Sequence, residues 1–288
     1  MTQKRPTPPV WRRRVGAQLV RYRGDMPAGD AARMMNWPGP RLSRIERGVY
    51  RVTADEVRTL CAKYGIDDPD GVDEVARVAE ERAGDGWWAA YADRIGKEYY
   101  DFIQLEAKAK TMRIQHPVVI PGPLQSPGFV REMITRAPTT VSAERAEMLV
   151  HVRLARQEIL TRDEEPVAVH ALVPESAFHA RFESGPSIMR DQLQRLLDLS
   201  ERPHVTLQIV PLTAHPTFGA NGAMTILTFR HPWTPVASVD NPMGGSHTED
   251  PDKVAVLTAE FDAIAAIALP VQESRDLLTT YLEGLHQK

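Results

Sequence analysis

The stretch GPRLSRIERG, residues 39–48, arranges three arginines around two aliphatic residues and ends in glycine. Leu42 and Ile45 lie three residues apart, so a helix would place them on one face and leave the arginines on the others. Pro38 and Pro40 suit the start of such a helix, because first-turn N–H groups have no partner within it. The final glycine suits its end. The stretch therefore predicts a short helix with one buried apolar face and an exposed basic surface.

Positive charge is concentrated at the front of the chain, although the whole chain has a formal net charge of -3. Residues 1–66 hold 14 Lys and Arg against 5 Asp and Glu, a local charge of +9, so the remaining residues carry -12. A basic N-terminal region followed by an acidic remainder is expected of a protein whose N-terminal region binds a polyanion. The plainer alternative is that these arginines only solvate a small helical domain, and the size of the excess makes this alternative the weaker one.

Length and cysteine content set wider limits. The 288 residues are enough for a small domain and a larger one. The single Cys61 excludes a disulfide framework and a cysteine-based zinc site, so we expect a reducing, cytoplasmic setting. Residues 1–10 are basic and proline-rich with no apolar segment after them, which predicts a flexible basic arm and no signal peptide. The apolar run at 261–271 contains Pro270 and is too short to span a membrane.

Residues 11–83 are expected to form five short helices. Trp11 and Val15 recur at helical spacing in the first segment, and Thr53 with Glu56 forms a capping box that opens the fourth. In chain order the segments are WRRRVGAQLVRYR, PAGDAARMMN, GPRLSRIE, TADEVRTLCAKYG and GVDEVARVAEERA. Cys61 falls on the apolar stripe of the fourth, where it is most simply a core residue.

The second and third helices have the spacing of a helix-turn-helix. Ala32 is small where the two helices would cross, and Asn36 tolerates the left-handed conformation that a tight turn requires. Leu42 and Ile45 would point inward and hold the crossing angle. The residues left for the outer faces are Gly39, Pro40, Arg41, Ser43, Arg44 and Arg47. A helix presented in this way fits the major groove of double-stranded DNA.

The exposed arginines are expected to have two roles in binding, contact with bases and contact with phosphates. Gly39 and Pro40 offer no side-chain donors at base edges, so sequence preference should fall to Arg44 and Arg41. An arginine fork meets guanine O6 and N7 together. Arg47, near the helix end, and Arg51 beyond it should reach only phosphate.

The pattern LSRIERG, with the basic helix before it and the capping box after it, resembles the xenobiotic-response-element (XRE) class of helix-turn-helix repressors over about residues 11–66. The resemblance implies a lambda-repressor-like, all-α domain that binds two DNA half-sites as a homodimer. Glu46 stands where such repressors have a structural acid, and Arg23 is its expected partner.

Residues 84–288 are expected to form a larger α+β domain. The β-branched runs VAVHALV, VTLQIVPL and AMTILTF predict strands, and a helix is expected in SIMRDQLQRLLDLSE, followed by two C-terminal helices divided at Pro270. Before them, an aromatic stripe would fall on one helical face: Trp88, Tyr91, Ile95, Tyr99 and Phe102. It is either an aromatic cage for a ligand or a packing face, and packing is the favoured interpretation.

Several stretches of this region resemble the C-terminal domain attached to this helix-turn-helix class in streptomycetes and related actinobacteria. They are FIQLEAKA, VIPGPLQSPGFVR, VRLARQ, ESAF, QLQRLLDLSERPHVTLQIVP and ESRDLL. The resemblance implies an antitoxin-like transcriptional regulator that is often encoded beside a small partner protein. The leading hypothesis is a DNA-binding regulator whose larger domain dimerises, senses or docks a partner. The alternative is an antitoxin whose primary role is to bind and neutralise that partner.

Chemical motifs are sparse. The sequence has no HExxH, Walker or GxSxG motif, so we expect no enzyme, cofactor or metal, although an enzyme carried on a DNA-binding module is a third hypothesis. One set of polar residues is a candidate effector or partner site: Glu106, Arg153, Arg156, Gln157 and Glu175. Three of them, at i, i+3 and i+4, would share a helix face and could bind an anion. A structural ion-pair network is the favoured interpretation.

Overall fold

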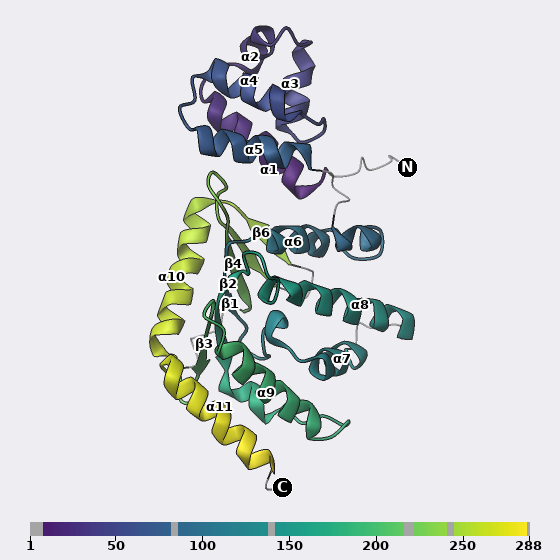
Figure 1. Ribbon diagram of the computed structural model, residues 1–288, viewed down its shortest axis with the longest axis vertical. Coiled ribbons are helices and arrows are strands. Elements are labelled where there is room, and N and C mark those ends of the chain that lie inside the picture. Colours follow the sequence, from purple (N-terminus) through teal and green to yellow (C-terminus); the bar gives the residue numbers. More distant parts are fainter. Residues whose placement is uncertain (1–7, 82–85, 138–141, 216–221, 241–244, 287–288) are drawn as a thin grey trace. The chain divides into compact units, whose positions relative to one another are not determined.

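The computed structural model describes residues 8–81, 86–137, 142–215, 222–240 and 245–286 (Figure 1). The chain divides into two compact units. The first comprises residues 1–105 together with 229–234, and the second comprises 106–228 and 235–288. The sequence places the boundary after residue 83, whereas the contacts join the following aromatic segment to the first unit. Most of the expected flexible arm lies outside the described residues.

Five α-helices follow one another in residues 8–81, as predicted. Thr53 and Glu56 form the capping box, in which Glu56 N donates to Thr53 Oγ1 over 3.2 Å and Thr53 N donates to Glu56 Oε2 over 3.0 Å. Asp68 accepts from Gly71 N over 3.1 Å and caps the fifth helix. The helices are α1 (Val10–Arg23), α2 (Ala28–Met34), α3 (Gly39–Glu46), α4 (Ala54–Tyr64) and α5 (Pro69–Glu80).

The core of these helices is aliphatic. Leu19, Leu42 and Leu60 are fully buried, and Val57 lies among them. Cys61 is buried as well, and this burial raises the pKa of its thiol to about 11. Cys61 is therefore a core residue, as its place on the apolar stripe predicts.

The aromatic segment after residue 86 does not form a single helical stripe. A 3-10 helix, η1 (Trp87–Tyr91), ends before Gly96, and α6 (Lys97–Ala107) begins after it. Trp87 packs edge-on against Trp88 and Tyr91, with ring centroids 5.9 and 6.1 Å apart. The expectation of one continuous helical face was therefore wrong.

The first unit also contains a segment distant in sequence, residues 229–234. Phe229 and Trp233 from this segment are buried against Trp11 of α1, with ring centroids 5.5 and 5.4 Å from it. The guanidinium carbon of buried Arg14 lies between 4.5 and 5.8 Å from the centroids of all three rings. This aromatic and cationic packing holds the segment against Trp11 and Arg14 of α1.

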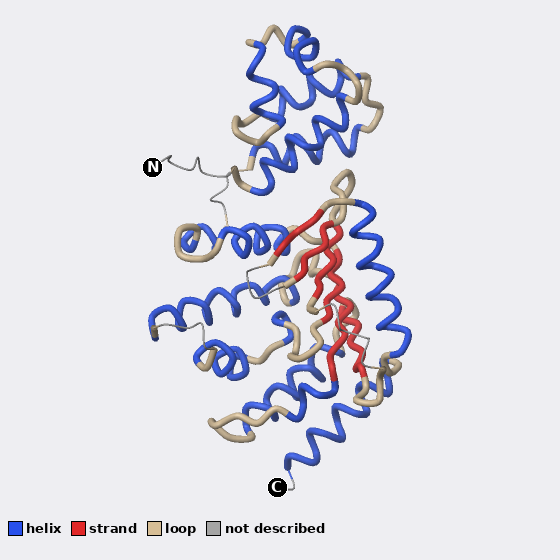
Figure 2. The backbone as a smooth tube through the Cα atoms, turned by 180° about the vertical axis from the view of Figure 1, so that it is seen from behind, coloured by secondary structure: helices blue, strands red, loops and turns tan. Residues whose placement is uncertain are grey.

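A mixed sheet forms the centre of the second unit (Figure 2). Its six strands, among the described residues, are ordered β3-β2-β1-β4-β5-β6. β1, β2 and β3 are parallel, whereas β4, β5 and β6 are antiparallel to their neighbours. The strands are β1 (Thr111–Gln115), β2 (Ala168–Pro174), β3 (Val205–Val210), β4 (Met224–Thr228), β5 (Val236–Val239) and β6 (Ser246–Thr248). The three predicted strands are β2, β3 and β4.

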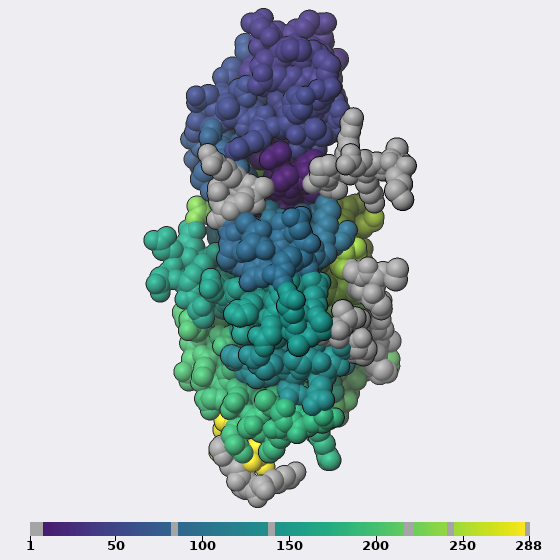
Figure 3. All heavy atoms as spheres, turned by 90° about the vertical axis from the view of Figure 1, so that its right-hand side faces the viewer, coloured from purple at the N-terminus to yellow at the C-terminus, as the bar shows by residue number. Residues whose placement is uncertain are grey.

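Helices cover both faces of this sheet (Figure 1). The space-filling view shows that the teal and green helices hide the sheet on their side (Figure 3). On the other side, Phe261 and Ile264 of α10 pack on Leu172, Met224 and Ile226 of the strands. The helices are α7 (Pro127–Thr135), α8 (Ala143–Ala155), α9 (Ser187–Ser200), α10 (Pro251–Ile267) and α11 (Val271–His286). The all-α region followed by an α+β region is the predicted layout.

Candidate nucleic-acid interface

Two glycines allow the backbone of α3 and of the turn after it to contact α1 directly. A Cβ at Gly16 would lie 2.3 Å from the carbonyl oxygen of Glu46 and 2.6 Å from that of Ile45. Gly48 has a φ of +70°, and its Cβ would lie 2.9 Å from the Cα of Arg13. Only glycine permits such a close approach of the two backbones. The position of α3 is therefore fixed at its C-terminal end by main-chain contact with α1.

The connection between α2 and α3 is a tight turn. Asn36 has a φ of 53°, in the left-handed region, and Trp37 N donates to Ala32 O over 2.9 Å. Ala32, Leu42 and Ile45 are buried beneath the two helices. The residues that the sequence assigns to the crossing thus lie together in the core of the first unit.

The acidic residue at the end of α3 is neutralised within the fold. Arg23 Nε donates to Glu46 Oε1 over 2.6 Å, and Arg23 Nη2 donates to Glu46 Oε2 over 3.3 Å. This pairing raises the pKa of Arg23, the hydrogen bonds being the largest cause. The pair that the sequence suggests is present, and Glu46 adds no uncompensated negative charge to the neighbouring surface.

The outward face of α3 differs along its length. Gly39, Pro40 and Arg44 are exposed, whereas Ser43 is half-buried. The Arg44 guanidinium lies 5.1 Å from the ring centroid of exposed Tyr50 and donates to its hydroxyl. Arg44 therefore contacts a neutral group on the surface, and these contacts leave its positive charge uncompensated.

Arg41 has a different environment, although both arginines were expected to contact bases. Its guanidinium lies 4.5 Å from the ring centroid of Trp37 and forms an ion pair with Glu56 of the capping box. This pairing offsets its charge and restrains its fork. Arg44 is therefore the stronger candidate for contact with a base.

Three further arginines lie around the C-terminal end of α3. Arg47 Nε donates to Ser43 O over 3.0 Å, and Arg51 Nη2 donates to Glu80 O over 3.1 Å. The pKa of Arg12 on α1 is lowered by burial and, to a smaller extent, by the positive charge of Arg51. The positive charges of Arg12 and Arg51 thus repel each other, and a phosphate bound nearby would lessen that repulsion.

Sequence reasoning missed Arg12, because the triplet at residues 12–14 looks uniform. The structure gives its members three different roles. Arg13 pairs with Asp101 over 2.8 Å, and Arg14 is buried among aromatic rings. Arg12 is the member of this triplet on which the charge of Arg51 acts, and the hint available in the sequence was its position on the basic face of the first helix.

The candidate effector set contains a buried ion pair. Arg156 Nε and Nη2 donate to Glu106 Oε2 and Oε1 over 2.7 and 2.8 Å. The two side chains are 10 % and 1 % exposed. Gln157 Nε2 donates to the carbonyl oxygens of Gly122 and Gln125 over 3.0 and 2.9 Å. These groups satisfy one another and the backbone of the 122–125 turn, as a structural network does.

The remaining members of that set are placed differently. Arg153 Nη1 donates to Gln125 Oε1 over 3.4 Å, so it contacts the same turn. Its helix α8 ends at Ala155, and Arg156 opens the 3-10 helix η3 (Arg156–Leu160), so the expected single helical face is divided between two helices. Glu175 lies elsewhere and accepts from Tyr281 Oη over 2.8 Å. The five residues do not form one site.

A family model matches most of the second unit, together with residues 99–105 and 229–234 of the first. The DUF5753 family, described as a domain of unknown function, matches residues 99–280, so this chain belongs to the DUF5753 family. No curated protein and no solved structure matches the chain.

Two further features bear on function. Among the described residues, no group of three or more His, Cys, Asp or Glu is placed to hold a metal ion. No single described helix is long and apolar enough to cross a membrane, and α10 and α11 meet that test only as a pair bent by 65°.

Proposed function

We propose that this chain is a sequence-specific, double-stranded-DNA-binding transcriptional regulator of the cytoplasm, in which α2 and α3 act as an XRE-type helix-turn-helix. The observation that carries the proposal is the construction of α3. Its inner face is seated on α1 through Gly16, its acid is neutralised by Arg23, and its outer face presents Arg44. A rigid helix with an exposed arginine suits the major groove.

The surrounding arginines would hold the phosphates. Arg47 and Arg51 follow α3, and Arg12 lies beside Arg51. Phosphate contacts fix the register of a protein on DNA without reading sequence, so these residues would set affinity while Arg44 sets preference. Arg41, which is paired to Glu56, would make a smaller contribution to base contacts.

The larger unit would make the regulator a homodimer, because two copies of α3 can then contact half-sites about one helical turn apart. Sedimentation velocity of the full chain at micromolar concentration should show a dimer, and footprinting should show paired protected sites. A monomer that protects one unpaired site would contradict this part of the proposal.

An antitoxin-like role, in which binding a small neighbouring protein is primary, has separate support. Val118 and Leu212 are 66 % and 58 % exposed and follow the carboxyl ends of parallel β1 and β3, which meet at one edge of the sheet. Exposed apolar residues at one edge suit a protein partner. Co-expression with the product of an adjacent small reading frame should yield a stable complex, and Leu212→Asp should disrupt it.

Selection of bound duplexes from a random pool tests DNA recognition directly. The full chain should enrich one motif, Arg44→Ala should bind with a flattened preference, and Arg51→Ala should weaken binding to all sequences about equally. Arg58→Ala on α4 is the matched control, because it removes the same charge from an arginine already paired with Asp73. Failure of the wild-type chain to enrich any motif would contradict sequence-specific recognition.

A further inference from the structure

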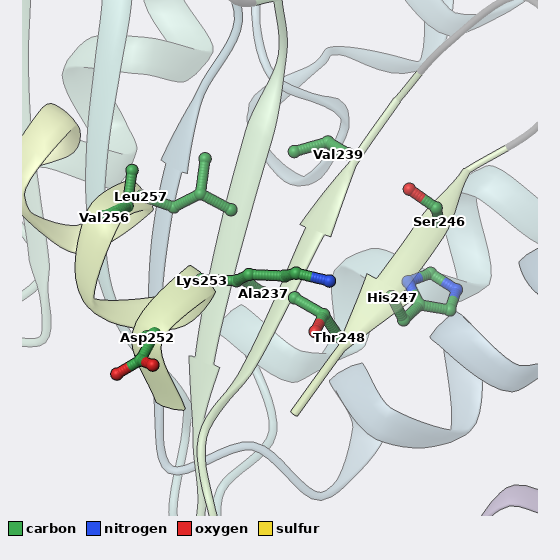
Figure 4. Close-up of a pocket in the computed structure, with 9 residues that line it drawn as sticks. All are labelled: Ala237, Val239, Ser246, His247, Thr248, Asp252, Lys253, Val256 and Leu257. Atoms are coloured by element: carbon green, nitrogen blue, oxygen red, sulfur yellow. The ribbon is translucent and has the colours of Figure 1, made fainter. Parts of the chain in front are cut away.

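Helix α10 covers the sheet unevenly. The cross-strand register places Met224, Val239 and Ser246 in one row on the α10 side of the sheet. Met224 is buried in the same cluster as Phe261 of α10. Toward the edge strand β6 this packing opens into a cavity of about 580 Å³ between the helix and the last two strands (Figure 4). This volume falls within the ~300–1,000 Å³ that is typical of small-molecule sites.

The walls of the cavity are mostly apolar. Ala237 and Val239 of β5 form its floor, and Leu257 and Val256 of α10 form one side. Val256 is 67 % exposed, so this apolar side chain borders the open side of the cavity. Ser246, His247 and Thr248 line the opposite rim on β6. The cavity therefore offers an apolar surface bordered by polar groups.

One charged group reaches across this apolar surface. In Figure 4 the Lys253 side chain extends from α10 over Ala237 toward the strands, whereas the Asp252 carboxylate points away from them. The carboxylate of Asp250 lies 3.9 Å from the Lys253 ammonium and accepts from the backbone N of Asp252 over 3.1 Å as the cap of α10. At that separation Asp250 and Lys253 form an ion pair without a hydrogen bond, so the ammonium N–H groups can still donate to a ligand.

We propose that this cavity binds a small amphipathic anion, whose apolar chain or ring lies on Val239, Val256 and Leu257 and whose acidic group is held by Lys253. The apolar walls supply most of the contact area, and the ammonium selects the charge of the head group. The proposal rests only on the second unit and does not depend on DNA binding.

Titration of the full chain with anilinonaphthalene sulfonate, a fluorescent probe with an apolar body and one anionic group, tests this site. We expect saturable binding of one probe per chain. Lys253→Met keeps most of the apolar length and removes the charge, so it should weaken binding about tenfold. Lys253→Arg should restore affinity to within about threefold. Lys110→Met, at an exposed lysine outside the cavity, is the matched control and should leave affinity unchanged.

Two further measurements distinguish this site from non-specific binding of the probe to apolar surface. Decanoate should displace the probe, whereas decyltrimethylammonium, which has the same chain and the opposite charge, should not. Val256→Glu, which places a like charge at the rim, should abolish probe binding while the thermal unfolding midpoint stays near that of wild type. Equal affinity of Lys253→Met and wild type, displacement by the cation alone, or the absence of saturable probe binding to wild type would overturn the proposal.

Discussion

Arg44 on α3 and Arg156 at the start of η3 are both arginines, but their environments are opposite. Arg156 is almost fully buried and forms two hydrogen bonds with Glu106, which is still more deeply buried. Arg44 is exposed and contacts the ring and hydroxyl of Tyr50. A buried, doubly bonded arginine holds the fold, whereas an exposed arginine beside a neutral group can give its donors to a ligand. The partner and the burial of an arginine therefore indicate its role better than its place in a motif.

The largest effect should follow from removing Arg156. Arg156→Ala leaves the Glu106 carboxylate buried without its cation, so the free energy of unfolding should fall by about 3–5 kcal/mol. Urea denaturation measures this loss. The matched control is Arg136→Ala, whose exposed pair with Glu183 should contribute no more than about 1 kcal/mol. Equal losses in the two variants would remove the distinction between buried and exposed arginines.

The next largest loss of stability should follow from disturbing the close backbone contact between α3 and α1. Gly16→Ala puts a methyl group 2.3 Å from the Glu46 carbonyl oxygen, so it should cost about 1–3 kcal/mol in unfolding free energy. Because α3 must shift, DNA affinity should fall as well. Gly29→Ala on α2 has no atom within 4 Å of the new methyl group and should be neutral or slightly stabilising. A harmless Gly16→Ala would show that the close contact does not position α3.

Arg44 and Arg41 should differ in their effect on base preference. Arg44→Ala should lose about 1–3 kcal/mol of discrimination at one base position, because its fork is the stronger candidate for a guanine contact. Arg41→Ala should lose less, since its fork is already held by Glu56 and Trp37. Competition binding with single-base operator variants measures both effects. A larger loss for Arg41→Ala would reverse the assignment.

A smaller effect should depend on pH. The hydrogen bond from His231 is the largest cause that lowers the pKa of Asp68 below its usual 3.8. A lowered carboxyl pKa stabilises the native state above pH 3.8, and this stabilisation is lost as pH falls through the native pKa. Asp68→Asn should therefore cost about 0.5–1.5 kcal/mol at pH 7 and progressively less below pH 4.

Thermal unfolding of wild type and Asp68→Asn between pH 3 and pH 7 measures that difference. Asp67→Asn, at the exposed neighbouring acid, should follow the wild-type curve. A difference between wild type and Asp68→Asn that stayed constant over the range would show that the carboxylate charge contributes nothing.

Local signals in the sequence predicted the elements that depend on local physics. Thr53 and Glu56 mark a helix start, Asn36 marks a turn, and the spacing of Leu42 and Ile45 marks a buried face, because each acts within a few residues. Strands β2, β3 and β4 are rich in β-branched residues and were also predicted. Strands β1, β5 and β6 were missed, since each has only three to five residues, and TMRIQ and SHT carry polar side chains.

The features that depend on tertiary contact could not be predicted in the same way. Trp233 packs on Trp11 across more than two hundred residues of chain, which no local pattern encodes. The pairing of Arg41 with Glu56 and the approach of Arg12 to Arg51 require the helices to be folded together first. The division of the arginines into structural and exposed groups follows from that packing.

The salt dependence of DNA affinity tests the central claim, that the arginines on and around α3 form a phosphate-binding surface, most directly. Fluorescence anisotropy of a labelled duplex with the full chain, from low to high salt, should give a linear fall in log affinity with a slope of about 0.9 per phosphate contacted. Arg51→Ala should reduce that slope by about one contact, whereas Arg58→Ala should leave it unchanged. An affinity independent of salt, or no binding at low salt, would contradict the account.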